Sequence, residues 1–108
     1  MIKIRGKEIN AQTLAKMIDF SILHPNSTAE DIKEGLEKCR KYNFNSFCVN
    51  PNYLSMVVEG LKGTDVEPSV VLDFPFGAGT EKIKLAAAED AVKRGAKALD
   101  MVIDIGAL

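Results

Sequence analysis

The chain has 108 residues, of which 46% are hydrophobic and 27% charged, a composition typical of one globular domain rather than a disordered segment. It carries 14 basic and 15 acidic residues, so its formal net charge is -1. A near-neutral chain lacks the strong field of one sign that favours binding to nucleic acid or to a membrane surface, and we expect neither. We treat residues 1–108 as one domain.

The sequence shows no targeting or membrane segment. No apolar run approaches the roughly 18 residues of a membrane span, and residues 1–8 lack the apolar core of a signal peptide. Cys39 and Cys48 are the only cysteines and do not form a CxxC pair, which favours reduced thiols in the cytoplasm. A single histidine, His24, argues against a zinc site, and we expect no metal.

Two helices are predicted first along the chain. Asn10 can cap a helix over 11–20, and a connector over 21–26 follows because Pro25 disfavours helix at the preceding residue. The spacing of Ser27 and Glu30 is that of a capping box, which predicts a helix over 28–42. Its inward positions are Ile32, Leu36 and Cys39.

Strands and helices then alternate. We predict strands at 44–49, 69–74 and 97–105, with helices at 51–62 and 80–94 between them. This order favours an α/β fold with parallel strands and right-handed crossovers. The strands begin roughly 25 residues apart, which is typical of a TIM (β/α)₈ barrel. Because a closed barrel needs at least about 200 residues, we predict one partial, incomplete barrel domain.

The last predicted strand has no helix after it to cover its outer face, which a parallel sheet requires. The sequence therefore indicates the opening part of a longer α/β protein, truncated after this strand. Open edges and the apolar side chains of Leu99, Met101 and Ile103 favour association through 99–108 and the edge of the first strand. Two copies would supply only six strands, too few for a regular eight-stranded barrel.

Candidate functional residues lie near the carboxyl ends of the strands, where parallel α/β proteins bind ligands. Alternation turns Asp100 toward a barrel interior, as a proton-transfer group or as half of a structural ion pair. Cys48 fits a small buried hydrophobe or a site residue, and Asn50 fits a helix cap better than a substrate contact. Asp73 can contact a ligand or cap a turn, and Asp19 is expected to close the first helix, solvated or held by a partner.

Four segments together resemble one family, the deoxyribose-phosphate aldolases. Residues 18–23 resemble its I-D-x-T-x-L opening, 47–51 its V-C-V-N-P strand end and 74–78 its F-P-x-G-A loop. Residues 95–108 resemble its G-A-x-E-I-D-M-V-I-N-I-G-A-L run. The order and spacing agree, and the resemblance extends from about Leu14 to Leu108.

This resemblance implies a class I aldolase that cleaves 2-deoxyribose 5-phosphate to acetaldehyde and glyceraldehyde 3-phosphate. A lysine Schiff base carries the reaction, so no metal or other cofactor is implied. Asp100 matches the aspartate of the proton relay, and Cys48 matches a cysteine that lines the site. The remaining matches place Asp19, Ser21 and Leu23 near the substrate hydroxyls and the aldehyde pocket, and Phe74 beside that pocket.

The sequence also departs from the family pattern. Phe20 replaces a histidine or leucine, Ser21 a threonine, Asp73 a glycine or asparagine, and Asp104 an asparagine. The added carboxylates of Asp73 and Asp104 are expected to repel a phosphorylated substrate. The Schiff-base lysine and the phosphate site belong to later strands of the family, and no lysine of this chain meets the requirements of a desolvated amine.

We therefore expect the amino-terminal part of such an aldolase, inactive alone, whose partners are a phosphorylated sugar or aldehyde and a second copy or the missing carboxyl-terminal half. The alternative is a non-catalytic assembly module or one half of a split enzyme. A small independent α/β ligand-binding domain is a further hypothesis.

Overall fold

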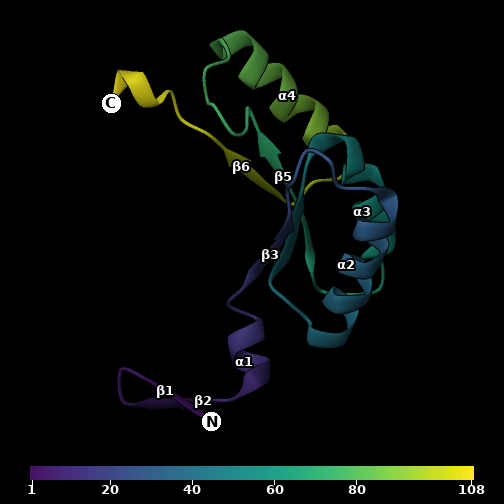
Figure 1. Ribbon diagram of the computed structural model, residues 1–108, viewed down its shortest axis with the longest axis vertical. Helices are drawn as coiled ribbons and strands as arrows, with labels where there is room; N and C mark the ends of the chain where they lie inside the picture. The colour runs from purple at the N-terminus through teal and green to yellow at the C-terminus, as the bar shows by residue number, and fades with distance from the viewer.

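A computed structural model describes all residues from 1 to 108, and its centre is a four-stranded sheet (Figure 1). The strands are β3 (Asp19–Ile22), β4 (Ser46–Val49), β5 (Glu67–Leu72) and β6 (Ala98–Met101), in that spatial order. Every neighbouring pair is parallel, as predicted. The helices α2 (Ala29–Tyr42), α3 (Leu54–Gly60) and α4 (Glu81–Lys93) all lie on one side of the sheet. The other side has no helical cover.

The first strand of this sheet was not predicted. The helix expected over 11–20 is only α1 (Ala11–Ala15), although Asn10 caps it as expected by accepting a hydrogen bond from the Thr13 amide. Residues 18–22 alternate between apolar and polar side chains, a period of two that fits a strand and not a helix. Phe20 and Ile22 thereby pack against the core, so tertiary packing settles residues 19–22 as strand β3.

The amino terminus forms a hairpin that was not predicted either. Strands β1 (Ile2–Ile4) and β2 (Lys7–Ile9) pair antiparallel through the dipeptide Arg5-Gly6. Both turn residues have positive φ, 49° and 78°, which a two-residue hairpin turn of type I′ requires. The hairpin lies away from the main sheet, next to α1 (Figure 1).

The remaining elements match their predicted positions with shifted ends. The capping box of α2 uses Thr28 and Asp31, one residue later than the predicted Ser27 and Glu30. The predicted helix over 51–62 is a short 3₁₀ turn, Pro51–Tyr53, followed by α3. Strand β6 ends at Met101, not at 105, because its neighbour β5 ends at Leu72 and only the Val102 amide still bonds to it. A second 3₁₀ turn, Ile105–Ala107, follows.

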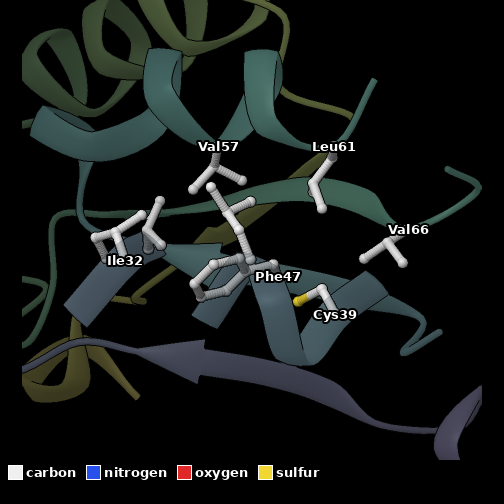
Figure 2. Close-up of a cluster of buried hydrophobic side chains, with 8 residues drawn as sticks. Ile32, Cys39, Phe47, Val57, Leu61 and Val66 are labelled. Atoms are coloured by element: carbon white, nitrogen blue, oxygen red, sulfur yellow. The ribbon is translucent and has the colours of Figure 1, made fainter. Parts of the chain in front are cut away.

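The larger part of the core lies between the sheet and helices α2 and α3. Phe47 of β4 is fully buried at its centre, and Val57 of α3 and Leu61, directly after α3, point toward it (Figure 2). The three predicted inward positions of α2, Ile32, Leu36 and Cys39, are all buried there. A second cluster under α4 contains Leu54, Val70, Leu72 and Ala91. Burial of this apolar surface holds the three helices on one face of the sheet.

None of the helices has the length and continuous apolar character that crossing a lipid bilayer demands.

Candidate functional site

The face of the sheet that points away from the helices carries the candidate residues. Phe47, Val49, Val70 and Leu72 face the helices, so their neighbours along each strand face the opposite way. We call this opposite side the open face. Register places on it Asp19, Ser21, Ser46, Cys48, Ser69, Val71 and Asp100. In a closed barrel this side is the interior, as the sequence predicted for Asp100.

Cys48 lies in the middle of the open face, paired with Ser21 on one side and Ser69 on the other. It is buried, with 4% of its surface exposed. Burial raises the pKa of the thiol, a hydrogen bond with Ser69 opposes this rise, and the carboxylates of Asp100 and Asp19 add to it. A thiol held in its neutral form is a poor nucleophile, so Cys48 is suited to lining a site.

Asp19 does not close a helix, as expected from the sequence, but begins β3. Its carboxylate accepts hydrogen bonds from Asn45 Nδ2 and from Ser46 Oγ, both at 2.7 Å. These two bonds lower the pKa of Asp19 against a small opposing effect of burial. Because Asp19 pairs with Ser46, it lies at the amino end of the sheet, below the level of Ser21 and Cys48. The structure therefore does not bring Asp19 to the carboxyl ends, where the other candidates gather.

Asp100 lies opposite Val71, near the carboxyl end of β6. The sequence led us to expect a buried carboxylate, but Asp100 is exposed because it lies on the edge strand β6, which has a neighbour on only one side. The alternative role, a structural ion pair with a lysine on a neighbouring strand, is not realised in any ion pair of the structure. The Asp100 carboxylate therefore has no ion-pair partner at this face.

Leu23 and Phe74 follow the carboxyl ends of β3 and β5. Both therefore lie at the edge of the sheet where the carboxyl ends of the strands meet, which we call the mouth. The Asn50 side chain holds the Leu23 segment in place, because its Nδ2 donates to the Leu23 carbonyl at 3.2 Å. Asn50 occupies the N-cap position before Pro51, as predicted, but its side chain makes no capping hydrogen bond to the following turn. Phe74 is 44% exposed and offers an apolar surface beside Asp73.

Sequence reasoning missed the lysine at this mouth. The Lys84 ammonium, on the first turns of α4, forms an ion pair with Asp73 Oδ2 at 2.6 Å. It also donates to the carbonyl oxygens of Gly77, at 2.8 Å, and Val102, at 2.7 Å. The two charged side chains are only 14% and 19% exposed. Asp73 also accepts a hydrogen bond from the Gly79 amide at 2.8 Å. Of the two roles that the sequence allowed for Asp73, ligand contact or turn capping, the structure shows the second.

A sequence signal for Lys84 exists. Ala87, Ala88 and Ala91 of α4 pack on the core, and Lys84 precedes them by three, four and seven residues. That spacing places all four on the same helix face. A lysine on the inward face of an alanine-rich helix predicts a buried ammonium with a nearby carboxylate, which Asp73 supplies.

No group of three or more His, Cys, Asp or Glu side chains is arranged to hold a metal ion.

Relatives and solved structures give one consistent answer. Over 102 residues the chain is 45% identical to the deoxyribose-phosphate aldolase of Caldanaerobacter subterraneus subsp. tengcongensis, a match that covers 94% of this chain and 44% of that protein. The chain is homologous to part of the deoxyribose-phosphate aldolases. The aldolase of Clostridium tetani is 47% identical over 95 residues, 88% of this chain and 44% of the relative. No model of a protein family matches.

The fold agrees with this relationship. The tetrameric deoxyribose phosphate aldolase of Aeropyrum pernix superposes with a TM-score of 0.84 and 26% identity, covering 91% of this chain and 42% of that structure. The four-stranded sheet is thus part of a TIM-barrel aldolase fold, which confirms the predicted fold class. The chain spans about 44% of the length of the curated aldolases it matches. This homology favours part of an aldolase over the alternative of a non-catalytic assembly module.

Proposed function

We propose that this chain forms the amino-terminal wall of a class I aldolase that cleaves 2-deoxyribose 5-phosphate to acetaldehyde and glyceraldehyde 3-phosphate. The observation that carries the proposal is the position of Asp100, an exposed carboxylate without an ion-pair partner near the carboxyl end of β6. The Asp100 carboxylate also helps to raise the pKa of the Cys48 thiol on the same face. In addition, the homology to aldolases covers nearly the whole chain. Asp100 is the proton-relay group of this proposal.

The other candidate residues shape the wall around Asp100. Ser21 offers a hydroxyl to the hydroxyl groups of the sugar, and Leu23 and Phe74 offer apolar contacts to the small aldehyde. Cys48 lines the site as a neutral thiol, since burial and two carboxylates raise its pKa. Asp19 supports the wall from below through Asn45 and Ser46, or reaches substrate hydroxyls when the remaining strands enclose it.

The ion pair at the mouth removes one objection to a phosphorylated substrate. We expected the carboxylates of Asp73 and Asp104 to repel a phosphate, but the Lys84 ammonium lies 2.6 Å from Asp73. The pair is neutral as a whole, so of these two carboxylates only Asp104 is left without a compensating charge. The same contacts exclude Lys84 as the Schiff-base amine, because three acceptors hold its ammonium and a Schiff base needs a neutral amine.

The test is a hybrid enzyme. The matching segment of the Caldanaerobacter aldolase is replaced by this chain, and cleavage of 2-deoxyribose 5-phosphate is followed by the acetaldehyde released. We expect turnover by the hybrid, and a loss of about a hundredfold or more in kcat for both Asp100→Leu and Asp100→Asn, as for removal of a general acid–base group. Asp104→Asn is the matched control and retains activity.

A folded hybrid without turnover, or turnover that survives both Asp100 variants, would overturn the proposal. The chain by itself is the second control. We expect that it captures no aldehyde on reduction with borohydride, and mass spectrometry reports any adduct.

Association and location complete the proposal. Leu99, Met101 and Ile103 are 41%, 50% and 54% exposed, which supports contact with a second copy or with the remaining aldolase strands. The predicted edge, however, was wrong: residues 46–49 are the inner strand β4, and the sheet edges are β3 and β6. A cytoplasmic location is part of the proposal and is supported by two free, buried cysteines, Cys39 and Cys48.

A further inference from the structure

The Lys84 ammonium connects three segments that lie apart in the sequence. Its own segment is the start of α4, which begins after the cap Thr80. The second is the loop after β5, bound through Asp73 and Gly77. The third is the end of β6, bound through the Val102 carbonyl. We call these three contacts the Lys84 bridge.

All three N–H donors of the Lys84 ammonium have an acceptor. An ammonium has three N–H donors, and three oxygen atoms lie within 2.6 to 2.8 Å of Nζ. Two of them are backbone carbonyls, so the lysine fixes main-chain position and not only side-chain charge. Both charged side chains are largely shielded from water, so removing either partner leaves the other charge poorly solvated.

The backbone around the Lys84 bridge is packed without spare room. Gly77 is buried, with φ of 66°, and a Cβ atom at this position would collide with the Ile103 carbonyl oxygen and with Val102 Cγ1. The loop after β5 therefore lies directly against the end of β6. The Gly77 amide donates to the Asp73 carbonyl, and the Val102 amide donates to the Leu72 carbonyl. A shift of the loop must move β6 as well.

Both ends of the Lys84 bridge carry candidate site residues. Val102 is two residues from Asp100 on the same extended segment, and Asp73 is adjacent to Phe74. We propose that Lys84, with Asp73, is a positioning residue that holds the Asp100 carboxylate and the Phe74 ring in fixed relation at the mouth of the site. This proposal rests on the proposed aldolase function for its catalytic consequence. Its structural half, the claim that Lys84 holds the loop after β5 against the end of β6, does not depend on that function.

The structural half is tested on the full chain by amide hydrogen exchange. Lys84→Met removes the ammonium and keeps most of the side-chain volume, and Asp73→Asn removes only the charge of its partner. We expect the Gly79 and Val102 amides to exchange about tenfold faster in both variants, while the core amide of Val49 does not change. Lys82→Met, an exposed lysine in the same helix turn, is the matched control and leaves all three amides unchanged.

The catalytic half is tested in the hybrid aldolase described above. We expect Lys84→Met to lower kcat/KM by about tenfold through kcat, because misplacement of a relay group affects the reaction step more than substrate binding. Lys84→Arg keeps the charge and several donors on a larger, planar group, and is expected to recover part of the loss. Lys82→Met has wild-type kinetics. A merely structural role would lower the amount of folded enzyme without this rescue or this selective effect on kcat.

The outcomes separate the two proposals. Unchanged exchange at Gly79 and Val102 in both variants overturns the Lys84 bridge, and so does faster exchange with unchanged kcat in an active hybrid. If Lys84→Met unfolds the whole chain, exchange at Val49 rises too, and Asp73→Asn then decides the question. If the unmutated hybrid has no activity, the aldolase proposal fails. The hydrogen-exchange measurements then still support or overturn the Lys84 bridge.

Discussion

Hydrogen bonding and burial act in opposite directions on the titratable side chains of the open face. Asp19 accepts bonds from Asn45 and Ser46, and its pKa falls. Cys48 is buried between neighbouring strands, and its pKa rises. The same surface therefore keeps one group charged and the other neutral at physiological pH, and each effect has its own measurable consequence.

The first consequence concerns stability and pH. A carboxylate whose pKa is lowered by folding stabilises the folded state above its unfolded pKa, about 3.9, and loses that contribution as pH falls through the lowered value. We expect Asp19→Ala to reduce the free energy of unfolding by about 1 kcal/mol near neutral pH, a value discounted for its exposure. Denaturant unfolding should show this difference shrinking below about pH 4.

The control for that measurement is Asp104→Ala. Asp104 is exposed and its side chain makes no capping hydrogen bond, so the variant should have little effect at either pH. A difference for Asp19→Ala that persists undiminished in acid would show that its hydrogen bonds do not depend on ionisation.

The second consequence concerns thiol reactivity. Burial raises the pKa of Cys39 to about 11, and Cys48 is raised as well. Because the thiolate is the reactive form, both cysteines should resist alkylation at about pH 8 in the folded chain and react fully in guanidinium chloride. Mass spectrometry of iodoacetamide-treated protein measures this. Rapid, complete labelling of Cys39 under native conditions would contradict its burial between α2 and the sheet.

At the scale of elements, helix α2 packs on β4 through a glycine. A Cβ atom at Gly35 would approach the Phe47 ring to 2.5 Å and Ile22 Cδ1 to 2.8 Å. The absence of a side chain therefore brings the helix close to the sheet. It also costs α2 helix propensity, so the two effects oppose each other.

The packing effect should prevail. Alanine improves intrinsic helix propensity by about 1 kcal/mol, but overpacking a filled core costs about 1–3 kcal/mol. We expect Gly35→Ala to lower the free energy of unfolding by about 1 kcal/mol, measured by urea denaturation. Glu34→Ala, on the exposed face of the same helix, should change it by less than about 0.5 kcal/mol. A stabilised Gly35→Ala variant would mean that Phe47 has room to move.

The elements that the sequence predicted correctly are those with a strong periodic pattern. The inward face of α2 and the Val-rich β5 follow from residue spacing alone. Strand β3 does not, because residues 11–20 also contain helix-compatible apolar spacing, and only packing of Phe20 and Ile22 on the core decides between them. Local propensity is a weak guide where tertiary contacts can override it.

The same limit applies to the candidate site. Alternation along the last predicted strand correctly placed Asp100 on the face away from the helices. Its exposure could not follow from that pattern, because exposure depends on what covers the face. The helical spacing of Lys84 was sufficient to predict an inward lysine with a nearby carboxylate. The contacts of Lys84 with the Gly77 and Val102 carbonyls were not predictable, because they depend on how the loop folds against β6.

At the scale of the whole molecule, the sheet has two free edges and one uncovered face. Strands β3 and β6 each have one unpaired side, and Met101, which pairs with Leu72 and so lies on the helix side of β6, is 50% exposed. We expect the chain alone to sediment as a species heavier than the monomer at micromolar concentration, because unpaired parallel edges and apolar surface favour association.

Two substitutions test whether the exposed apolar surface of β6 mediates this association. Met101→Lys should shift the sedimentation profile toward the monomer, whereas Ile4→Lys, on the separate amino-terminal hairpin, should not. A monodisperse monomer of the unmutated chain would overturn the expectation. The strand count also changes one earlier inference: two copies contain eight parallel strands, the number in a closed barrel, and not the six predicted from the sequence.

The spatial order β3-β4-β5-β6 is also the order of synthesis. Each strand pairs with one already made, and α2, α3 and α4 each lie between two consecutive strands in the chain. A nascent polypeptide leaving the ribosome can therefore add one strand and one helix at a time to a growing sheet, without waiting for a distant segment to arrive. Strand β3 itself pairs only with β4, so each later strand uses the strand made just before it as its template.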